Sequence, residues 1–309
     1  MLGADALSLW LAPPVLGLLG LCIGSFLNVV VHRLPRMMER EWLDEMAEHL
    51  KDGEAFKNLF REEPAKELSV AGDMLAARLE SLPAYNLWRP GSACPKCGHQ
   101  IRWYENLPVV GWLSLRGRCS ACKTPISWRY PAMELLTGVL FAAAGWHFGA
   151  QPATLMWCAV IATLLALAAI DWDTTLLPES MTLPLIGGGL AASALGWTTV
   201  SLPSAVGGAL VGYLSLWSIY WLFKLATDKE GMGYGDFKLL CGLGAWLGLP
   251  AILPIVLMSS VVGSVIGLWL KFSGGLRQGV YVPFGPFLAG GGLIVILVGS
   301  APINRWLGW

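Results

Sequence analysis

Charged residues are scarce in this sequence of 309 residues: Asp, Glu, Lys and Arg make up 14%, whereas hydrophobic residues make up 55%. This composition excludes an ordinary soluble domain and indicates a membrane protein. The charges are also concentrated, since 15 of the 21 Lys and Arg residues lie between Arg33 and Arg129, and 13 of the 21 acidic residues lie between Glu39 and Glu105. We therefore expect one apolar segment, a polar domain of about a hundred residues and a long membrane region.

Histidine is rare as well, with only His32, His49, His99 and His147 in the chain. None of them forms a His-Glu-x-x-His pair, so the ligands of a membrane metalloprotease are missing. The sequence also lacks the Gly-x-Ser-x-Gly motif that exposes a nucleophilic serine in the α/β-hydrolases. Among proteolytic mechanisms, one based on paired carboxylates is what remains.

The amino-terminal apolar segment is interpreted as a membrane helix. The first nine residues carry Asp5 but no basic residue, and no small-x-small cleavage pattern follows. A removable signal peptide is therefore not expected, and residues 7–31 are predicted to form the first span.

Seven further apolar segments follow the polar domain. The stretch from Leu239 to Leu270 has no charge and is too long for one span, because a helix needs roughly 20 residues to cross ~30 Å of hydrocarbon. Gly248-Leu249-Pro250 provides a break within it. The sequence thus predicts eight transmembrane helices, of which the last seven fall within residues 132–303. The segments are Ala132–Gly149, Pro152–Ile170, Met181–Val200, Leu202–Phe223, Phe237–Leu249, Ala251–Leu270 and Phe284–Ser300.

The order of these spans places the polar domain, Asp171 and Asp236 on one side of the membrane, because two spans separate each from the next. Short loops rich in Lys and Arg face the cytoplasm. The opposite loops near Ala150, Thr199 and Pro250 carry no basic residue. We therefore expect the polar domain and both aspartates to face the cytoplasm. The basic residues on their side are Arg33, Arg36, Arg40, Lys224, Lys229, Lys238, Lys271 and Arg277.

The polar domain, residues 33–131, has two predicted parts. Residues 36–82 show helical spacing of apolar side chains, which fits a helix on the lipid surface, a helix packed on the second part, or a solvated hairpin. In the second part, residues 92–130, two Cys-x-x-Cys pairs are separated by 21 residues, a spacing typical of a closed structural zinc site. Two disulfides are the alternative, but they require an oxidising compartment. His99 is a competing ligand. The four cysteines are Cys94, Cys97, Cys119 and Cys122.

Asp171 and Asp236 each lie at the edge of a long apolar segment. A carboxylate at a membrane boundary is costly to keep, so both are functional candidates, and two that share one proton could activate a water molecule. Asp173 is an alternative to Asp171, but Asp171 directly abuts the apolar run. Lys238 either holds Asp236 ionised or extends to the interface.

Glu179 follows Pro178 at the predicted start of a helix. There the helix dipole favours an acidic side chain, so we assign it a structural role. Gly231, Gly233 and Gly235 precede Asp236, where a lack of side chains lets the backbone turn and approach a substrate strand. No strand precedes these glycines and no Lys-Ser/Thr pair follows them, which argues against a phosphate-binding loop.

Several of these motifs together resemble the bacterial type IV prepilin peptidases, GxGD-type aspartic membrane peptidases that serve type IV pili and type II secretion. The resemblance covers nearly the whole chain. Gly24–Pro35 is similar to the amino-terminal signature of that family, the paired cysteines to its cytoplasmic zinc domain, and Arg129–Leu135 to its return into the membrane. Gly231–Lys238 matches its Gly-x-Gly-Asp-x-Lys pattern.

This resemblance implies an all-α polytopic membrane protein of the bacterial inner membrane, with about eight transmembrane helices and a zinc-ribbon-like cytoplasmic domain inserted after the first. It implies that Asp171 and Asp236 are catalytic, with Gly233, Gly235 and Lys238 in support. Glu179 is a departure, since the family commonly has Pro-Asp where this chain has Pro178-Glu179.

The activity implied is removal of the leader from prepilins and pseudopilins at the cytoplasmic surface, followed by N-methylation with S-adenosylmethionine. Gly117 falls where the family's methyl transfer has been tied to a glycine. The expected partners are these substrates, the lipid bilayer and components of pilus or secretion assembly, with no nucleic acid. A rival hypothesis is a transporter or assembly scaffold whose carboxylates carry protons or ions. Such a transporter would have deeper carboxylates and an inverted repeat, which the sequence does not show.

Overall fold

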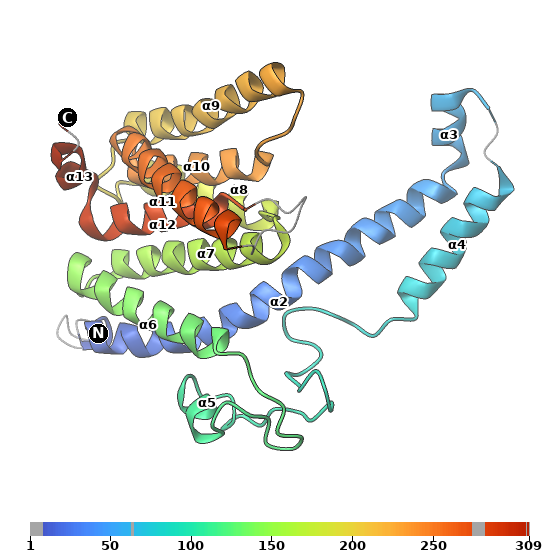
Figure 1. Cartoon of the computed structure of the whole chain (residues 1–309), viewed down its shortest axis with the longest axis horizontal. Helices are drawn as coiled ribbons and strands as arrows, with labels where there is room; N and C mark the ends of the chain where they lie inside the picture. The colour runs from blue at the N-terminus through green and yellow to red at the C-terminus, as the bar shows by residue number, and fades with distance from the viewer. Residues whose placement is uncertain (1–8, 63–64, 274–281, 307, 309) are drawn as a thin grey trace.

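The computed structural model describes residues 9–62, 65–273, 282–306 and 308. Within these ranges the chain is helical, and the only strand-like pairing is two isolated antiparallel bridges, Ala93 with Gln100 and Arg118 with Pro125 (Figure 1). Leu7 and Arg277, used in the sequence predictions, lie outside the described residues. The helices are α2 (Pro13–Lys51), α3 (Gly53–Phe60), α4 (Lys66–Glu80), α5 (Val110–Ser114), α6 (Arg129–Phe148), α7 (Pro152–Thr174), α8 (Glu179–Ala194), α9 (Leu202–Thr227), α10 (Tyr234–Leu247), the 3₁₀ turn η1 (Leu249–Ala251), α11 (Ile252–Phe272), α12 (Gly285–Val298) and α13 (Ser300–Trp306).

The molecule has the helices of a multi-pass membrane protein. Among the described residues, α2, α7, α9 and the segment η1–α11 are each long and apolar enough to cross a bilayer. Helices α12 and α13 meet at a bend of 103° and add a fifth candidate span if the two are counted as one. Each predicted apolar segment after the polar domain contains a helix, but α10 and α12 have only 14 residues. At 1.5 Å per residue, such a helix covers about 21 Å, less than the hydrocarbon thickness.

Helix α2 continues without a break across the expected boundary near residues 31–33 and ends only at Lys51. Its 39 residues correspond to about 58 Å, so half of the helix projects beyond the bundle. There α4 packs against it, and a Cβ on Gly72 would lie 2.9 Å from the carbonyl oxygen of Ala47. Figure 1 shows this hairpin projecting away from the bundle, so its helices α3 and α4 do not pack on the cysteine module.

Close helix contacts hold the membrane part together. On α2, a Cβ at Gly24 would lie 2.6 Å from the Cα of Glu134 in α6. Gly208 of α9 and Gly244 of α10 approach equally closely, because a Cβ on Gly208 would lie 2.5 Å from the carbonyl oxygen of Gly244. Small residues are what allow helix backbones to approach in lipid.

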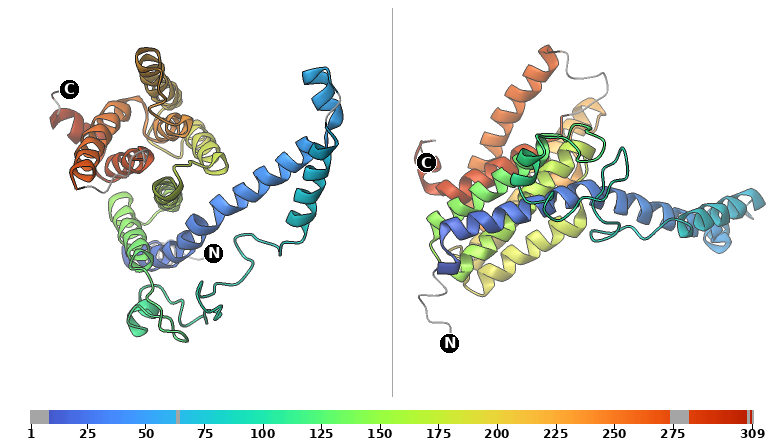
Figure 2. Two further views of the ribbon diagram at one scale, coloured as in Figure 1. Left: turned by 45° about the vertical axis from the view of Figure 1, so that its right-hand side comes forward. Right: turned by 90° about the horizontal axis from the view of Figure 1, so that it is seen from below.

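Helix α7 lies at the centre of the bundle, with α2 and α6 on one side and α8, α10 and α12 around the rest (Figure 2). It contacts α2, α6, α8 and α12. Across the bundle, the Trp246 indole nitrogen donates to the carbonyl oxygen of Leu185 at 2.7 Å, which fixes α10 against α8. This packing brings the carboxyl end of α7 next to the amino end of α10.

Candidate active site and metal centre

Asp171 lies in the last turn of α7, and its side chain is 5% exposed. The helix ends just beyond it, because Thr175 adopts a left-handed conformation with φ of 55° and its N–H donates to the Asp171 carbonyl oxygen. The Asp171 carboxylate accepts a hydrogen bond from the backbone N–H of Gly285 at 3.0 Å. Since Gly285 is the first residue of α12, the positive end of that helix faces the carboxylate and favours its ionised form.

Asp236 lies in the first turn of α10 and is 6% exposed. Its Oδ1 has no hydrogen-bond partner among the residues that the structure describes. A buried carboxyl oxygen without a hydrogen-bond partner is costly when the group is ionised and less so when the group is protonated. Burial disfavours a charge on either aspartate, and the helix-start amide of Gly285 partly offsets that cost at Asp171.

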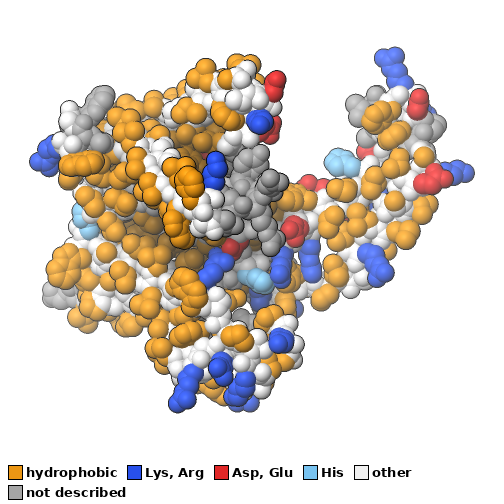
Figure 3. Space-filling model, in the orientation of Figure 1, with side chains coloured by type: hydrophobic (Ala, Val, Ile, Leu, Met, Phe, Trp, Pro, Cys, Tyr) orange, Lys and Arg blue, Asp and Glu red, His pale blue; other side chains and the backbone are white. Residues whose placement is uncertain are grey.

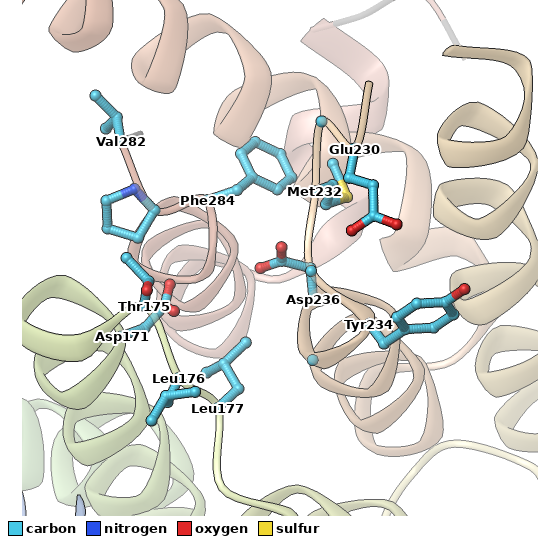
Figure 4. Close-up of a pocket in the computed structure, with 14 residues that line it drawn as sticks. Asp171, Thr175, Leu176, Leu177, Glu230, Met232, Tyr234, Asp236, Val282 and Phe284 are labelled. Atoms are coloured by element: carbon cyan, nitrogen blue, oxygen red, sulfur yellow. The ribbon is translucent and has the colours of Figure 1, made fainter. Parts of the chain in front are cut away.

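The two carboxyl groups face one pocket of about 400 Å³ from opposite sides (Figure 4). They are near enough for the charge of Asp171 to act on Asp236. Leu177 lies on one side of the space between them and Phe284 on the other. The pocket is lined by Asp171, Thr175, Leu176, Leu177, Glu230, Gly231, Met232, Gly233, Tyr234, Gly235, Asp236, Val282, Pro283 and Phe284.

Gly233 and Gly235, which precede Asp236, differ in whether packing requires a glycine. A Cβ on Gly235 would lie 2.7 Å from the Cβ of Leu177, so glycine is needed for the α10 start to pack on the α7–α8 loop. A Cβ on Gly233 would meet nothing closer than the Asp236 carboxylate at 4.0 Å. Packing therefore does not require glycine at 233, and the bare backbone there leaves room beside Asp236.

The other charged residues that the sequence singled out, Asp173, Lys238 and Glu179, form ion pairs with partners other than Asp171 and Asp236. Arg129 makes a bidentate pair with Asp173, at 2.9 and 3.0 Å, which turns Asp173 away from the pocket. Lys238 pairs with Glu179 rather than with Asp236. Glu179 is the first residue of α8, the position where the helix dipole favours an acidic side chain.

Sequence reasoning missed two functional contacts. Gly285, which donates to Asp171, lies 114 residues further along the chain, and Arg129 lies 44 residues before Asp173. Pro283, Gly285 and Pro286 at the start of the last apolar run indicate a helix start, but no local pattern shows which side chain that start faces. Glu230, which lines the pocket, pairs with Lys224 at 2.8 Å.

The four predicted cysteines lie together in the module preceding α6, with their Sγ atoms within 4.8 Å of one another. The Sγ atoms of Cys94 and Cys122 are 3.8 Å apart, and those of Cys97 and Cys119 are 3.9 Å apart. These are not disulfide distances, so the alternative of two disulfides is wrong. A tetrahedral zinc ion with Zn–S bonds of about 2.3 Å requires neighbouring sulfurs about 3.8 Å apart. The geometry therefore fits a closed structural zinc site.

The two halves of the module are built alike. The amide of Gly98 donates to the Cys94 carbonyl oxygen, and that of Lys123 donates to the Cys119 carbonyl oxygen, so each pair closes a tight turn. Hydrogen bonding with Thr124 lowers the pKa of Cys122 to about 6. His99 contacts Ser120 and Glu105 instead of joining the four sulfurs.

Gly117 has a structural explanation. Its φ is +65°, and a Cβ there would lie 2.8 Å from the ring of Trp112. Its carbonyl oxygen accepts from the amide of Ile126, and its own amide donates to Trp112. These contacts account for glycine at this position through the fold of the module.

Comparisons with known proteins agree with this arrangement. Residues 18–148 match the Bacterial Peptidase A24 N-terminal domain, and residues 158–268 match the Type IV leader peptidase family. No solved structure matches the chain.

Three relatives, each named prepilin leader peptidase/N-methyltransferase, are similar over most of their length. The protein of Burkholderia pseudomallei (strain 1026b) is 48% identical over 282 residues, covering 91% of this chain and 84% of the relative. That of Aeromonas hydrophila is 46% identical over 297 residues, covering 96% and 94%. That of Pseudomonas aeruginosa is 46% identical over 290 residues, covering 94% and 91%. With two matching domains and such relatives, this chain belongs to the type IV leader peptidase family.

Proposed function

We propose that this protein is a membrane aspartic endopeptidase that removes the leader of prepilins and pseudopilins and then N-methylates the new amino terminus. The relatives' shared name supports both activities. One observation carries the peptidase assignment: two buried carboxyl groups, Asp171 at the end of α7 and Asp236 at the start of α10, face the same pocket. Two carboxyl groups that face one site and share a proton are what an aspartic protease uses.

We infer the roles of the two groups from the amide of Gly285, which offsets part of the cost of a charge on Asp171. Asp171, which accepts the Gly285 amide, is the carboxylate that takes a proton from water. The resulting hydroxide attacks the carbonyl carbon of the scissile bond, while the protonated Asp236 donates to the carbonyl oxygen. When the tetrahedral intermediate collapses, Asp171 passes its proton to the leaving amine. Asp236 takes back the proton that it gave to the carbonyl oxygen. The bare backbone at Gly233 gives the substrate strand room to approach.

In this proposal the protein is a multi-pass protein of the inner membrane, with eight transmembrane segments and a zinc-ribbon-like domain. Helix α6 and the shorter helices α8, α10 and α12 are the four segments that, with α2, α7, α9 and α11, bring the number to eight. The pocket and the cysteine module face the cytoplasm in this proposal. Lys224, Lys238 and Lys271, at the end of α9, the start of α10 and the end of α11, support this orientation. The apolar helix of the substrate stays in the bilayer, which leaves its scissile bond at the cytoplasmic surface.

Two cofactors are implied. Zinc, held by the four cysteines, leaves no open coordination position and stabilises the module without taking part in cleavage. S-adenosylmethionine supplies the methyl group of the second reaction. Gly117, which the resemblance ties to methyl transfer, is the residue that we propose for this reaction, beside its role in the packing of the module.

The test compares Asp171→Asn, Asp236→Asn and Asp173→Asn on a purified prepilin in detergent. The first two variants are expected to lose cleavage completely, and Asp173→Asn is expected to retain it, because Arg129 holds that side chain outside the pocket. Full cleavage by Asp171→Asn or Asp236→Asn would refute the assignment. The rival hypothesis of a transporter would be supported if the wild-type protein did not cleave the prepilin and if ion flux depended on Asp171 and Asp236.

A further inference from the structure

Residues 101–116 of the cysteine module expose an unusual number of large apolar side chains. Trp103 is 79% exposed and Leu113 is 60% exposed. The only acidic residue of the segment, Glu105, has a side chain that is 7% exposed and accepts the backbone amide of Arg102. The outward surface of the segment is therefore apolar and basic, and it lacks acidic groups. Its exposed large apolar residues are Ile101, Trp103, Tyr104, Leu107, Val110 and Leu113.

A hydrogen bond fixes the depth of this segment relative to the membrane helices. The amide of Val109 donates to the Glu134 carboxylate at 2.7 Å. Glu134 is five residues past Arg129, the first residue of α6, so it lies about 7 Å along the helix. The loop carrying Leu107 and Val110 is therefore held against the first turns of α6.

The start of α6 carries the side chains expected at a membrane–water interface. Trp128 is 71% exposed and Tyr130 is 45% exposed, and Trp and Tyr concentrate at the headgroup level of a bilayer. Further along the helix, Leu135, Leu136 and Val139 are exposed as a lipid-facing helix requires. Figure 1 places the module beside this end of α6, on the flank of the bundle.

The charge of the module suits an anionic surface. Residues 92–130 contain six basic residues and one acidic residue, namely Lys96, Arg102, Arg116, Arg118, Lys123, Arg129 and Glu105. A zinc ion with four thiolates would carry a net charge of about −2, which still leaves the module positive. The face visible in Figure 3, around α5, shows Lys and Arg side chains and no acidic one.

We propose that residues 101–116 form an interfacial anchor that docks the cysteine module on the anionic phospholipid surface. Trp103, Val110 and Leu113 enter the headgroup region, while Arg116 and Arg118 contact lipid phosphates. Lipid is the occupant because the module leads directly into α6, and the Val109–Glu134 bond holds the segment at the depth where α6 enters the bilayer. The anchor is independent of the peptidase assignment, since no pocket residue belongs to it.

The test measures amide hydrogen exchange of residues 101–116 in the full-length, zinc-loaded protein. The protein is placed in detergent, in nanodiscs of phosphatidylcholine, and in nanodiscs of phosphatidylcholine with phosphatidylglycerol. Exchange is expected to be slowest with phosphatidylglycerol, and raised salt should reverse that effect because the contact is electrostatic. Arg116→Gln and Arg118→Gln should each reduce the protection about fivefold at low salt.

Matched controls lie on α4 of the projecting hairpin. Leu113→Ser should abolish the protection, whereas Met74→Ser, at a side chain that is 67% exposed, should leave it unchanged. Arg78→Gln is the control for charge. Zinc content is measured in every variant to establish that the module is folded. Equal exchange in all three environments would overturn the proposal, as would protection that appears only at high protein concentration or only with added prepilin, which would assign the surface to a second copy or to the substrate.

Discussion

Replacing Gly285 by Ala should disable the pocket without unfolding the protein. A Cβ at this position would lie 2.6 Å from the Asp171 Oδ2 and 3.1 Å from its Cγ. Ordinary contact begins at 3.4 Å, so the carboxylate must move by about 0.8 Å, a misplacement large enough to cost about 100-fold in rate. The displaced carboxylate also loses its hydrogen bond from the Gly285 amide, a charged interaction worth roughly 1.5–3 kcal/mol.

The effect on stability should be much smaller. The atom that must move is the end of a short side chain beside a pocket, so no backbone has to shift. The melting temperature of Gly285→Ala is therefore expected to stay within roughly 4 °C of the wild-type value. The lost rate should appear in kcat rather than KM, because Asp171 is proposed to act on the attacking water.

The same helix provides the control. A Cβ on Gly290 of α12 would meet nothing within 4 Å, so Gly290→Ala should cleave at the wild-type rate and could gain up to about 1 kcal/mol from helix propensity. Both variants are assayed for kcat and KM on a purified prepilin, alongside thermal unfolding. Wild-type kcat in Gly285→Ala would refute the reasoning that this amide positions Asp171. An equal loss of activity in Gly290→Ala would show that α12 responds to substitution in general.

Three further predictions concern the residues around the pocket and the metal centre. Arg129→Met should lower kcat by less than about tenfold and the free energy of unfolding by no more than about 1 kcal/mol, because the Arg129–Asp173 pair is partly exposed. A double-mutant cycle with Asp173→Asn should show that the two changes in unfolding free energy are not additive. Full additivity would contradict the pairing. Cys119→Ser should release zinc, lower the melting temperature and reduce methylation while leaving cleavage in place, and unchanged metal content measured by mass spectrometry would argue against the site. Glu179→Gln and Lys238→Gln should each leave cleavage within about threefold of wild type, because this exposed pair only joins the starts of α8 and α10; complete loss in Lys238→Gln alone would show that Lys238 acts on Asp236 directly.

Local patterns in the sequence were enough for several features of this protein. The spacing of Cys94, Cys97, Cys119 and Cys122 predicts the metal centre, because each pair forms its own turn through neighbouring amides. The break at Gly248 is also local, since a φ of +78° followed by Pro250 ends one helix and starts the next. The apolar segments predict where helices occur for the same reason: hydropathy is a property of adjacent residues.

The tertiary structure decided which charged residues meet. Apolar context alone favoured Asp171 over Asp173, but the structure supplies the reason, because Arg129 pairs with Asp173 across 44 residues. The Gly285 amide reaches Asp171 across 114 residues, and Lys238 contacts Glu179 instead of Asp236. Such contacts depend on how the helices pack, and packing depends on close backbone approaches such as Gly208 against Gly244, which no single segment encodes. The sequence by itself therefore determined the membrane class, the cysteine centre and the pair of aspartates, whereas helix packing determined the surroundings of each carboxyl group, from which we infer their roles.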